Sequence, residues 1–343
     1  WKQTLFVAED TGIIDLAVSK NNPKIMFAAS WQKDRKAWHF DGDGEKSGIY
    51  KSEDGGTSWE LVTTKESGFP ANEGVGRIGL ALFNENVIYA VVDNQNKRPK
   101  TASKNKLTTM LSTPGADFME ISNKELNIAL KESGFGDKYR AENIKNWVAN
   151  NNMEPKEVLA VLSDANKALF ETEVIGCEVY KSEDDGKSWK KTNQNYIDDM
   201  FYTYGYYFAN ISVDEKNQNR VYIGGVPLLF SEDGGKTFDI ISKENVHADH
   251  HVTWVNPENQ NHIINGNDGG VNISYDNGAH WIKCNNEAVS QFYAVNVDYQ
   301  ENYNVYGGMQ DNGVWFGPNN YSHNVAWHQE GKYPYQELIG GDG

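Results

Sequence analysis

Pairs of short apolar segments recur along the chain, and a turn rich in Asn, Asp, Gly or Pro separates the two members of each pair. In the first pair, residues 13–18 precede the turn Asn21-Asn22-Pro23 and residues 25–30 follow it. Four more pairs occupy 78–82 with 87–92, 211–213 with 220–223, 251–255 with 262–265, and 292–297 with 304–307. Short apolar runs bounded by turn residues are typical of strands. The pattern predicts an all-β protein with five small antiparallel sheets, the blades of a β-propeller.

A hairpin motif follows four of these pairs. It reads Ser-x-Asp-x-Gly-x-x-aromatic at residues 52–59, 182–189, 231–238 and 274–281. An aspartate in such a turn accepts backbone N–H groups across the loop, and the glycine supplies a positive φ. The closing aromatic ring returns to pack between neighbouring sheets. We therefore expect a structural role for the motif aspartates Asp54, Asp184, Asp233 and Asp276, and for the closing residues Trp59, Trp189, Phe238 and Trp281.

The spacing of the motifs reveals an insertion. Trp189, Phe238 and Trp281 follow one another at similar intervals, whereas Trp59 and Trp189 lie much further apart. Between them the pattern becomes helical, with a capping box at residues 122–125, an apolar stripe that follows it, and helical segments at 141–149 and 155–169. This predicts blades at 1–94, a helical insertion at 95–174 in the second blade, and further blades at 175–343.

Both ends of the chain look like parts of further blades. Trp1-Lys2-Gln3-Thr4 resembles the Trp-Lys-Lys-Thr sequence that begins at the closing aromatic residue of the second motif, and residues 331–343 resemble the start of another blade. We expect five visible blades of a propeller with seven or more.

Composition and charge narrow the function classes. The 343 residues carry a formal charge of −16, which disfavours a nucleic-acid partner. No apolar run reaches the roughly 20 residues of a transmembrane helix, and the first residues do not have the pattern of a signal peptide. We expect no transmembrane segment.

The four motifs resemble the Asp boxes of the BNR-repeat superfamily. Together with the sequence around His247 to Trp254, the Gly266-Asn267-Asp268-Gly269 turn and residues 304–313, they make the chain similar to bacterial secreted proteins described as sortilin N-terminal-like or as glycosyl hydrolases with BNR repeats. This resemblance implies an extracellular or cell-surface scaffold that binds protein or glycan. The alternative is a glycoside hydrolase similar to family-74 xyloglucanases. Sialidases carry an Arg-Ile-Pro motif and three clamping arginines. Here the motif is replaced by Arg77-Ile78-Gly79, which argues against sialidase activity.

Polar side chains collect at one end of the predicted blades. Asp268 and Asp311 follow the second strands of adjacent blades, and an acid–base pair of carboxylates is the machinery of glycoside hydrolysis. The aromatic residues that could stack on a sugar there are Trp254, Tyr293 and Trp315, and the flanking polar residues are His250, Gln310 and Asn312.

A divalent metal site is another interpretation of the same segment. His247, Asp249 and His251 alternate, so an extended strand would place all three on one face. The plainer interpretation of these residues is structural: Asp268 and Asp311 cap tight turns, and the histidines satisfy buried backbone groups. No cofactor is predicted beyond this possible metal ion.

Overall fold

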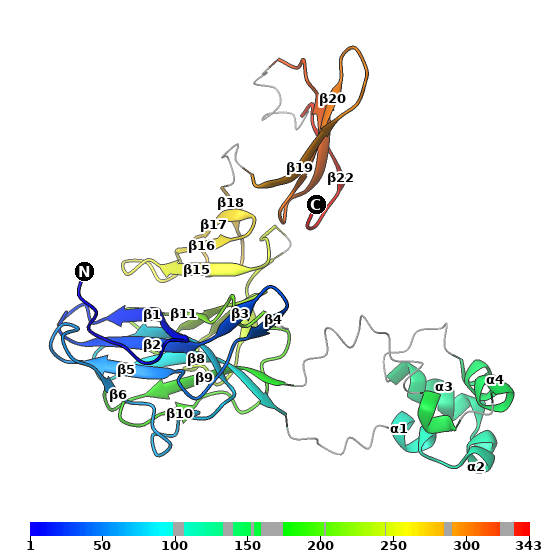
Figure 1. Ribbon diagram of the computed structural model, residues 1–343, viewed down its shortest axis with the longest axis horizontal. Coiled ribbons are helices and arrows are strands. Elements are labelled where there is room, and N and C mark those ends of the chain that lie inside the picture. The colour runs from blue at the N-terminus through cyan, green and yellow to red at the C-terminus, as the bar shows by residue number, and fades with distance from the viewer. Residues whose placement is uncertain are drawn as a thin grey trace. The chain divides into compact units, whose positions relative to one another are not determined.

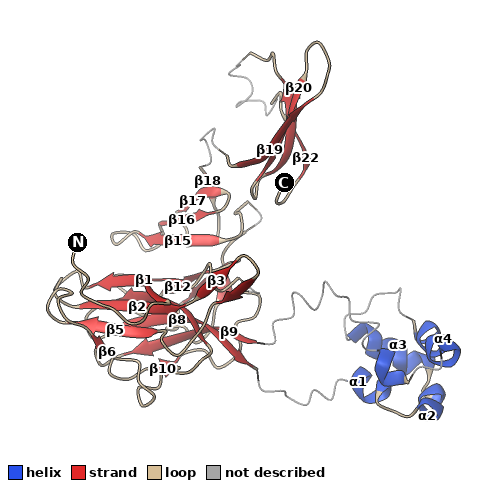
Figure 2. Cartoon of the chain, in the orientation of Figure 1, coloured by secondary structure: helices blue, strands red, loops and turns tan. Residues whose placement is uncertain are grey.

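The computed structural model describes residues 1–98, 106–132, 140–151, 154–158, 174–201, 204–243, 245–284, 290–322 and 333–343. The chain divides into two compact units. One comprises Trp1–Gln95 with Gly176–Gly343, and the other comprises Asn96–Ile175. Strands form the first unit and helices the second (Figure 2). None of the helices within the described residues combines the length and apolar character needed to cross a bilayer.

The first unit consists mainly of five four-stranded antiparallel sheets, each with its strands joined to neighbours in sequence (Figure 1). The first sheet contains β1 (Thr11–Val18), β2 (Met26–Gln32), β5 (Gly48–Ser52) and β6 (Glu60–Leu61). A separate hairpin joins β2 to β5 and is formed by β3 (Asp34–Lys36) and β4 (His39–Asp41). The second sheet contains β7 (Val75–Leu82), β8 (Ile88–Lys97), β9 (Val174–Ser182) and β10 (Lys190–Lys191).

The remaining three sheets repeat this order. The third contains β11 (Asn210–Val213), β12 (Val221–Gly224), β13 (Leu228–Ser231) and β14 (Asp239–Ile240). The fourth contains β15 (His250–Val255), β16 (Ile263–Asn267), β17 (Gly270–Ser274) and β18 (Ile282–Lys283). The fifth contains β19 (Phe292–Val297), β20 (Asn304–Met309), β21 (Gly313–Pro318) and β22 (Gln336–Ile339). All five strand pairs expected from the apolar pattern are present.

The first strands of the first four sheets lie side by side, which is the arrangement of propeller blades. Strand β7 contacts both β1 and β11, and β11 also contacts β15. Side chains connect these inner strands directly: Asp15 accepts the backbone N–H of Leu80 at 2.8 Å, and the Ser212 hydroxyl donates to the Thr253 carbonyl at 2.7 Å. The predicted propeller fold is therefore confirmed, with the five sheets as blades one to five.

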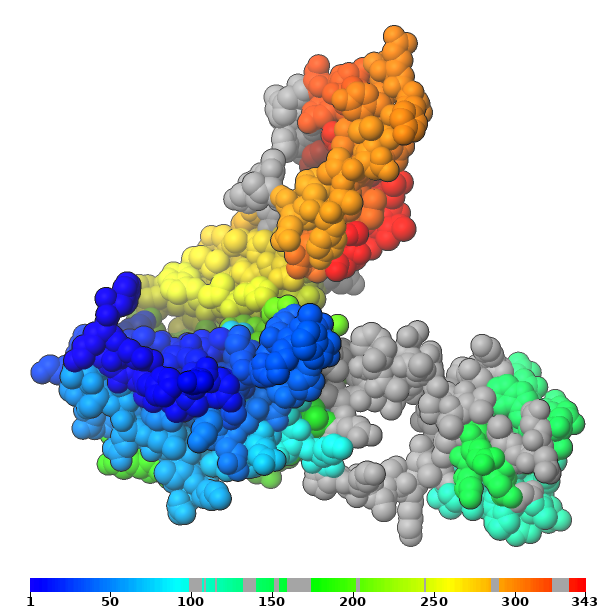
Figure 3. All heavy atoms as spheres, viewed as in Figure 1, coloured from blue at the N-terminus to red at the C-terminus, as the bar shows by residue number. Residues whose placement is uncertain are grey.

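Apolar residues between blades form the core. Phe27 and Ile49 of the first blade meet Ile78 and Ile88 of the second, and all four are fully buried. Figure 3 shows the blue first blade as one continuous surface. Strand β19 of the fifth blade differs, because all six of its residues are exposed.

The Asp boxes close the blades as expected. Asp276 accepts the backbone N–H of His280 at 2.8 Å, and the Ser274 hydroxyl accepts the N–H of Gly278 at 2.8 Å. The same bonds recur in the other three boxes. Trp189 and Trp281 are buried, and the indole N–H of Trp189 donates to the Gly186 carbonyl at 3.0 Å. The motif therefore stabilises the fold with its own side chains.

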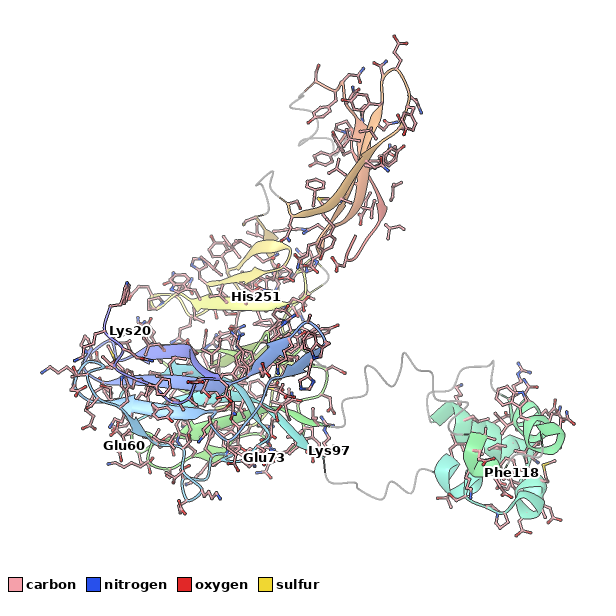
Figure 4. The ribbon with its side chains drawn as sticks, in the orientation of Figure 1. Lys20, Glu60, Glu73, Lys97, Phe118 and His251 are labelled. Carbon is pink, nitrogen blue, oxygen red and sulfur yellow. The ribbon has the colours of Figure 1, made fainter. Side chains whose placement is uncertain are left out.

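The second unit is the helical insertion between β8 and β9. Its helices are α1 (Lys106–Leu111), α2 (Gly115–Glu120), α3 (Asn123–Glu132) and α4 (Ala141–Asn151), with a short 3-10 turn at Pro155–Glu157. They surround a core that includes Phe118, labelled in Figure 4, together with Leu126 and Leu130. Ser122 caps α3 as expected, because its hydroxyl accepts the backbone N–H of Glu125 at 3.2 Å. The Glu125 carboxylate accepts this hydroxyl at 3.0 Å, and not the Ser122 backbone N–H that a full capping box would use.

Two expectations about elements need comment. Residues 331–343 do not start a new blade, because β22 pairs with β21 and is the fourth strand of the fifth blade. The repeat pattern in the sequence did not indicate this, because no Asp box precedes β22. Most of the helix predicted at 155–169 lies outside the described residues; its first residues form the 3-10 turn.

Candidate functional site

The two ends of the blades carry different connections. At the box end lie the four Asp-box turns, at 52–59, 182–189, 231–238 and 274–281. At the loop end, the second strand of each blade connects to the third, through residues 33–47, 98–173, 225–227, 268–269 and 310–312. The helical insertion is thus a loop-end connection, and the predicted site residues Asp268 and Asp311 lie in two others.

Three carboxylates from the fourth and fifth blades converge at the loop end. Asp249, Asp268 and Asp311 each offer an oxygen atom, and these atoms all lie within 4.8 Å of one another. Asp249 directly precedes β15, Asp268 follows β16, and Asp311 follows β20. We call these three residues the carboxylate cluster.

Backbone geometry explains why aspartate occupies two of these positions. Asp249 has a φ of 64° and Asp311 a φ of 58°, in the left-handed region that Asp and Asn tolerate better than other residues with a Cβ atom. Close packing constrains the turn of the third member, Asp268: a Cβ atom added at the next residue, Gly269, would lie 2.5 Å from the Cβ atom of His247, so glycine is required there.

Two carboxylates of the cluster, Asp311 and Asp249, have a raised pKa. Burial raises the pKa of Asp311 most, and the charge of Asp268 and a carboxyl–carboxyl hydrogen bond with it raise it further. Burial and then the charge of Asp268 also raise the pKa of Asp249, against an opposing effect of His247 and His251. Negative charge is therefore concentrated here without full compensation by the protein.

The histidines surround the cluster and do not complete it. His251, labelled in Figure 4, places Nε2 2.5 Å from Oδ1 of Asp268. The ring nitrogens of His247 lie 3.1 Å from the carbonyl oxygens of Ala248 and Asp311. His250 is buried, with Nδ1 2.7 Å from Oδ1 of Asn265, and burial lowers its pKa to about 4.

The expected metal triad of His247, Asp249 and His251 is wrong in its geometry. Strand β15 begins at His250, and the left-handed conformation of Asp249 breaks the alternation that would have placed the three on one face. Within the described part of the chain, the carboxylate cluster is the one group whose ligand atoms are close enough to hold a metal ion together. Its three oxygen donors are of the kind that Ca²⁺ and Mg²⁺ prefer, though fewer than either ion requires.

The predicted aromatic residues divide between the cluster and its surroundings. Tyr293 is 53% exposed, and a hydrogen bond to Asp342 raises its pKa. The same Asp342 accepts the backbone N–H of Asp311 at 3.3 Å, so Tyr293 lies next to the cluster. Trp254 instead meets His262, in the turn at the opposite end of β15, with 5.7 Å between ring centroids.

The turn that bears Asp311 is held by its neighbours. The indole N–H of Trp315 donates to the Asn312 carbonyl at 2.7 Å, and the Asn312 amide donates to the Gln310 carbonyl at 2.9 Å. Gln310 and Asn312 therefore border the cluster, and Trp315 supports the turn from β21.

Asp93 is a loop-end carboxyl group that the sequence analysis missed. It lies in the middle of β8, is buried, and has a pKa raised to about 6, mainly by burial. Its carboxylate accepts the Gln95 amide at 2.7 Å. The available signal was an acidic residue that directly follows the apolar run Tyr89-Ala90-Val91-Val92.

The solved structures that match this chain are distant from it in sequence. No family model and no curated protein matches the chain. Among solved structures, the GH74 xyloglucanase from Xanthomonas campestris is 8% identical with a TM-score of 0.45, over 98% of this chain and 39% of that one. A Hadza microbial sialidase is 12% identical with a TM-score of 0.40, and the match covers 98% of this chain and 60% of the sialidase chain. YCF48 bound to a D1 peptide is 9% identical with a TM-score of 0.39, and the match covers 90% of this chain and 65% of the YCF48 chain. Ligand and activity must therefore be argued from the site itself.

Proposed function

We propose that this chain is a binding propeller, secreted or displayed at a cell surface, whose loop end holds a protein or glycan ligand. The observation that carries the proposal is the convergence of Asp249, Asp268 and Asp311 from two blades. Their mutual repulsion favours a ligand that brings positive charge or several N–H or O–H donors. Lysine and arginine side chains of a protein, or the hydroxyl groups of a glycan, supply such donors.

The exposed aromatic residues support the same proposal. Phe292 and Tyr293, at the start of β19, are 52% and 53% exposed. Aromatic rings beside polar anchors are common both at protein interfaces and in sugar-binding grooves. A divalent cation held by the carboxylate cluster would add a bridge to ligand oxygens, with Asp249, Asp268 and Asp311 as its protein ligands.

Glycoside hydrolysis is the second candidate, and one observation favours it. The pKa of Asp311 is raised next to Asp268, as expected of a general acid beside a second carboxylate. However, oxygen atoms of the two carboxyl groups lie within 4.8 Å of each other, whereas the carboxyl groups of glycosidases stand about 5–10 Å apart with substrate or water between them. Binding therefore fits the observed geometry better than catalysis.

The test compares single variants in glycan-array and peptide-array binding, with and without added Ca²⁺. Asp268→Asn and Asp311→Asn remove one charge each from the cluster, and we expect each to weaken binding at least about tenfold, as for other charged binding anchors. Glu60→Gln makes the same change of charge on the exposed strand β6 and serves as the matched control (Figure 4).

The outcomes separate the candidates. Equal binding by wild type and both Asn variants would contradict the proposed site. Release of reducing sugar from a polysaccharide by wild type and Glu60→Gln, but by neither Asn variant, would favour the hydrolase.

A further inference from the structure

A pocket of 690 Å³ opens at the box end, between the second and third blades. One wall comes from β9 and β10 of the second blade, and the other from two turns of the third blade. The first wall includes Lys181, Lys190 and Lys191, and the second includes Asn219, Gly234 and Lys236. The pocket is separate from the carboxylate cluster, and its basic residues stand out in a chain with a net charge of −16.

The fourth position of each Asp box has the same backbone geometry. This position holds Gly55, Asp185, Gly234 and Asn277, with φ values of 74°, 68°, 76° and 56°. In each box its N–H donates to a carbonyl in the turn between the first two strands of its own blade, at 2.9–3.1 Å. What differs among the four boxes is the side chain at this position.

We call the boundary between two adjacent blades a seam. In the two seams on either side of the pocket, the side chain at this fourth position bonds to the preceding blade. Asp185 of the second blade forms an ion pair with Lys51 of the first. Asn277 of the fourth blade accepts the hydroxyl of Tyr222 in the third at 2.7 Å, and it also accepts Arg220 at 2.8 Å.

In the seam that contains the pocket, the fourth box position is Gly234. It has no side chain to bind the corresponding lysine and tyrosine of the preceding blade. Lys181 is the counterpart of Lys51, since each precedes the serine that opens its box. Tyr89 is the counterpart of Tyr222, since each lies three residues after the carbonyl that receives the box N–H.

The Tyr89 hydroxyl is the clearest sign of a missing group. Its side chain is fully buried, and within the described part of the chain the hydroxyl has no hydrogen-bond partner. A Cβ atom added at Gly234 would lie 3.2 Å from that oxygen, so the hydroxyl ends directly behind the pocket wall. Lys181 lies over the same ring, with its Nζ atom 5.6 Å from the centroid.

The charges around the pocket favour an anion. Of its two carboxylates, Asp233 accepts two backbone N–H groups of its own box at 3.0 Å, and Glu183 pairs with Lys181 at 2.7 Å. Neither Lys190 nor Lys236 forms an ion pair with any residue that the structure describes. Two ammonium groups thus face the pocket without a paired carboxylate.

We propose that this pocket binds a small carboxylate ligand of about the size of a hexuronic acid, which volumes of this order accommodate. Its carboxylate oxygens take the place that the Asp185 carboxylate and the Asn277 amide oxygen occupy in the neighbouring seams, accepting from Lys181 and from the Tyr89 hydroxyl. Lys190 and Lys236 add charge attraction at the pocket mouth.

The test titrates glucuronate into the whole chain and follows binding by calorimetry, with glucose as the uncharged analogue and sulfate as a second anion. We expect saturable binding of glucuronate, and at least tenfold weaker binding of glucose and of sulfate. Gly234→Asp supplies the carboxylate from the chain itself, as Asp185 does, and should abolish glucuronate binding. Gly55→Asp is the matched control, because it has the same φ region and nothing lies within 4 Å of its added Cβ atom.

A milder variant guards against a failure to fold. Tyr89→Phe removes only the hydroxyl and should weaken glucuronate binding about fivefold, the usual value of one hydrogen bond. The proposal is overturned if wild type shows no saturable binding, if glucose or sulfate binds as well as glucuronate, or if the folded Gly234→Asp variant binds as wild type does. Loss of binding in Gly55→Asp as well would equally contradict it.

Discussion

Aspartates lie in tight, left-handed turns at both ends of the blades, yet they are in opposite electrostatic states. At the box end, hydrogen bonds from the backbone and ring of His280 lower the pKa of Asp276 to about 2. At the loop end, burial and neighbouring carboxylates raise the pKa of Asp249 and Asp311. The box carboxylates are satisfied by their own turns, whereas the loop-end carboxylates face one another. An aspartate in a glycine-rich turn is therefore informative about function only when the turn's own N–H groups do not bind it.

The largest expected effect tests the structural role of the box end. Trp189→Ala should lower the free energy of unfolding by about 3–5 kcal/mol, because the ring is buried between blades and its removal leaves a cavity. Urea unfolding measures the change. Trp38→Ala is the control, since that side chain is 83% exposed, and a similar loss there would contradict the packing argument.

Replacing a buried carboxyl group at the loop end should have the opposite effect and raise stability at neutral pH. The pKa of Asp93 in the fold is about 6, above the ordinary value of 3.8, so its contribution is fully present below about pH 4 and is lost as the pH rises through 6. Asp93→Asn should leave stability unchanged at pH 4 and raise it by about 2–3 kcal/mol at pH 7. Unfolding curves across this pH range check it; parallel curves for wild type and variant would rule out the raised pKa.

The serine at the first position of an Asp box should contribute more to stability than the hydroxyl at its seventh position. Ser182 is fully buried and accepts the N–H of Gly186 at 2.9 Å, so Ser182→Ala leaves a buried N–H without its acceptor. We expect a loss of about 1–2 kcal/mol. Ser188→Ala removes an exposed hydroxyl that binds the same aspartate and should cost less than about 0.5 kcal/mol. Equal effects in thermal unfolding would show that burial does not set the difference.

The smallest effect is also the most direct comparison, because the same substitution is made at both ends. Asp311→Asn relieves repulsion in the carboxylate cluster and should raise stability at pH 7 by less than about 1 kcal/mol, since solvent screens this half-exposed group. Asp276→Asn removes an acceptor of two His280 donors and should lower stability. Calorimetric melting that moves in the same direction for both variants would contradict the distinction between the ends.

The sequence predicted what depends on local repetition. The Ser-x-Asp-x-Gly motif identified four box turns, and its irregular spacing identified the helical insertion. It failed where contacts between distant segments decide the outcome. The pairing of β22 with β21 follows no Asp box, and the alternation of His247, Asp249 and His251 gave no hint of the positive φ at Asp249. Asp268 and Asp311 were proposed as a pair, but their closeness to Asp249 depends on how two blades meet.

The points where the helical insertion leaves β8 and returns to β9 allow the insertion to vary between related chains. Strands β8 and β9 are hydrogen-bonded neighbours, so the insertion leaves and re-enters the blade through adjacent positions. Arg98 closes this exit by donating to the carbonyls of Val174 and Ile175, at 2.8 and 3.3 Å. The helices have a core of their own, and the length of a loop adds little to the entropic cost of closing a hairpin. The helical insertion is therefore an interchangeable module. Evolution, or a protein engineer, can exchange its contents while the host blade keeps its register.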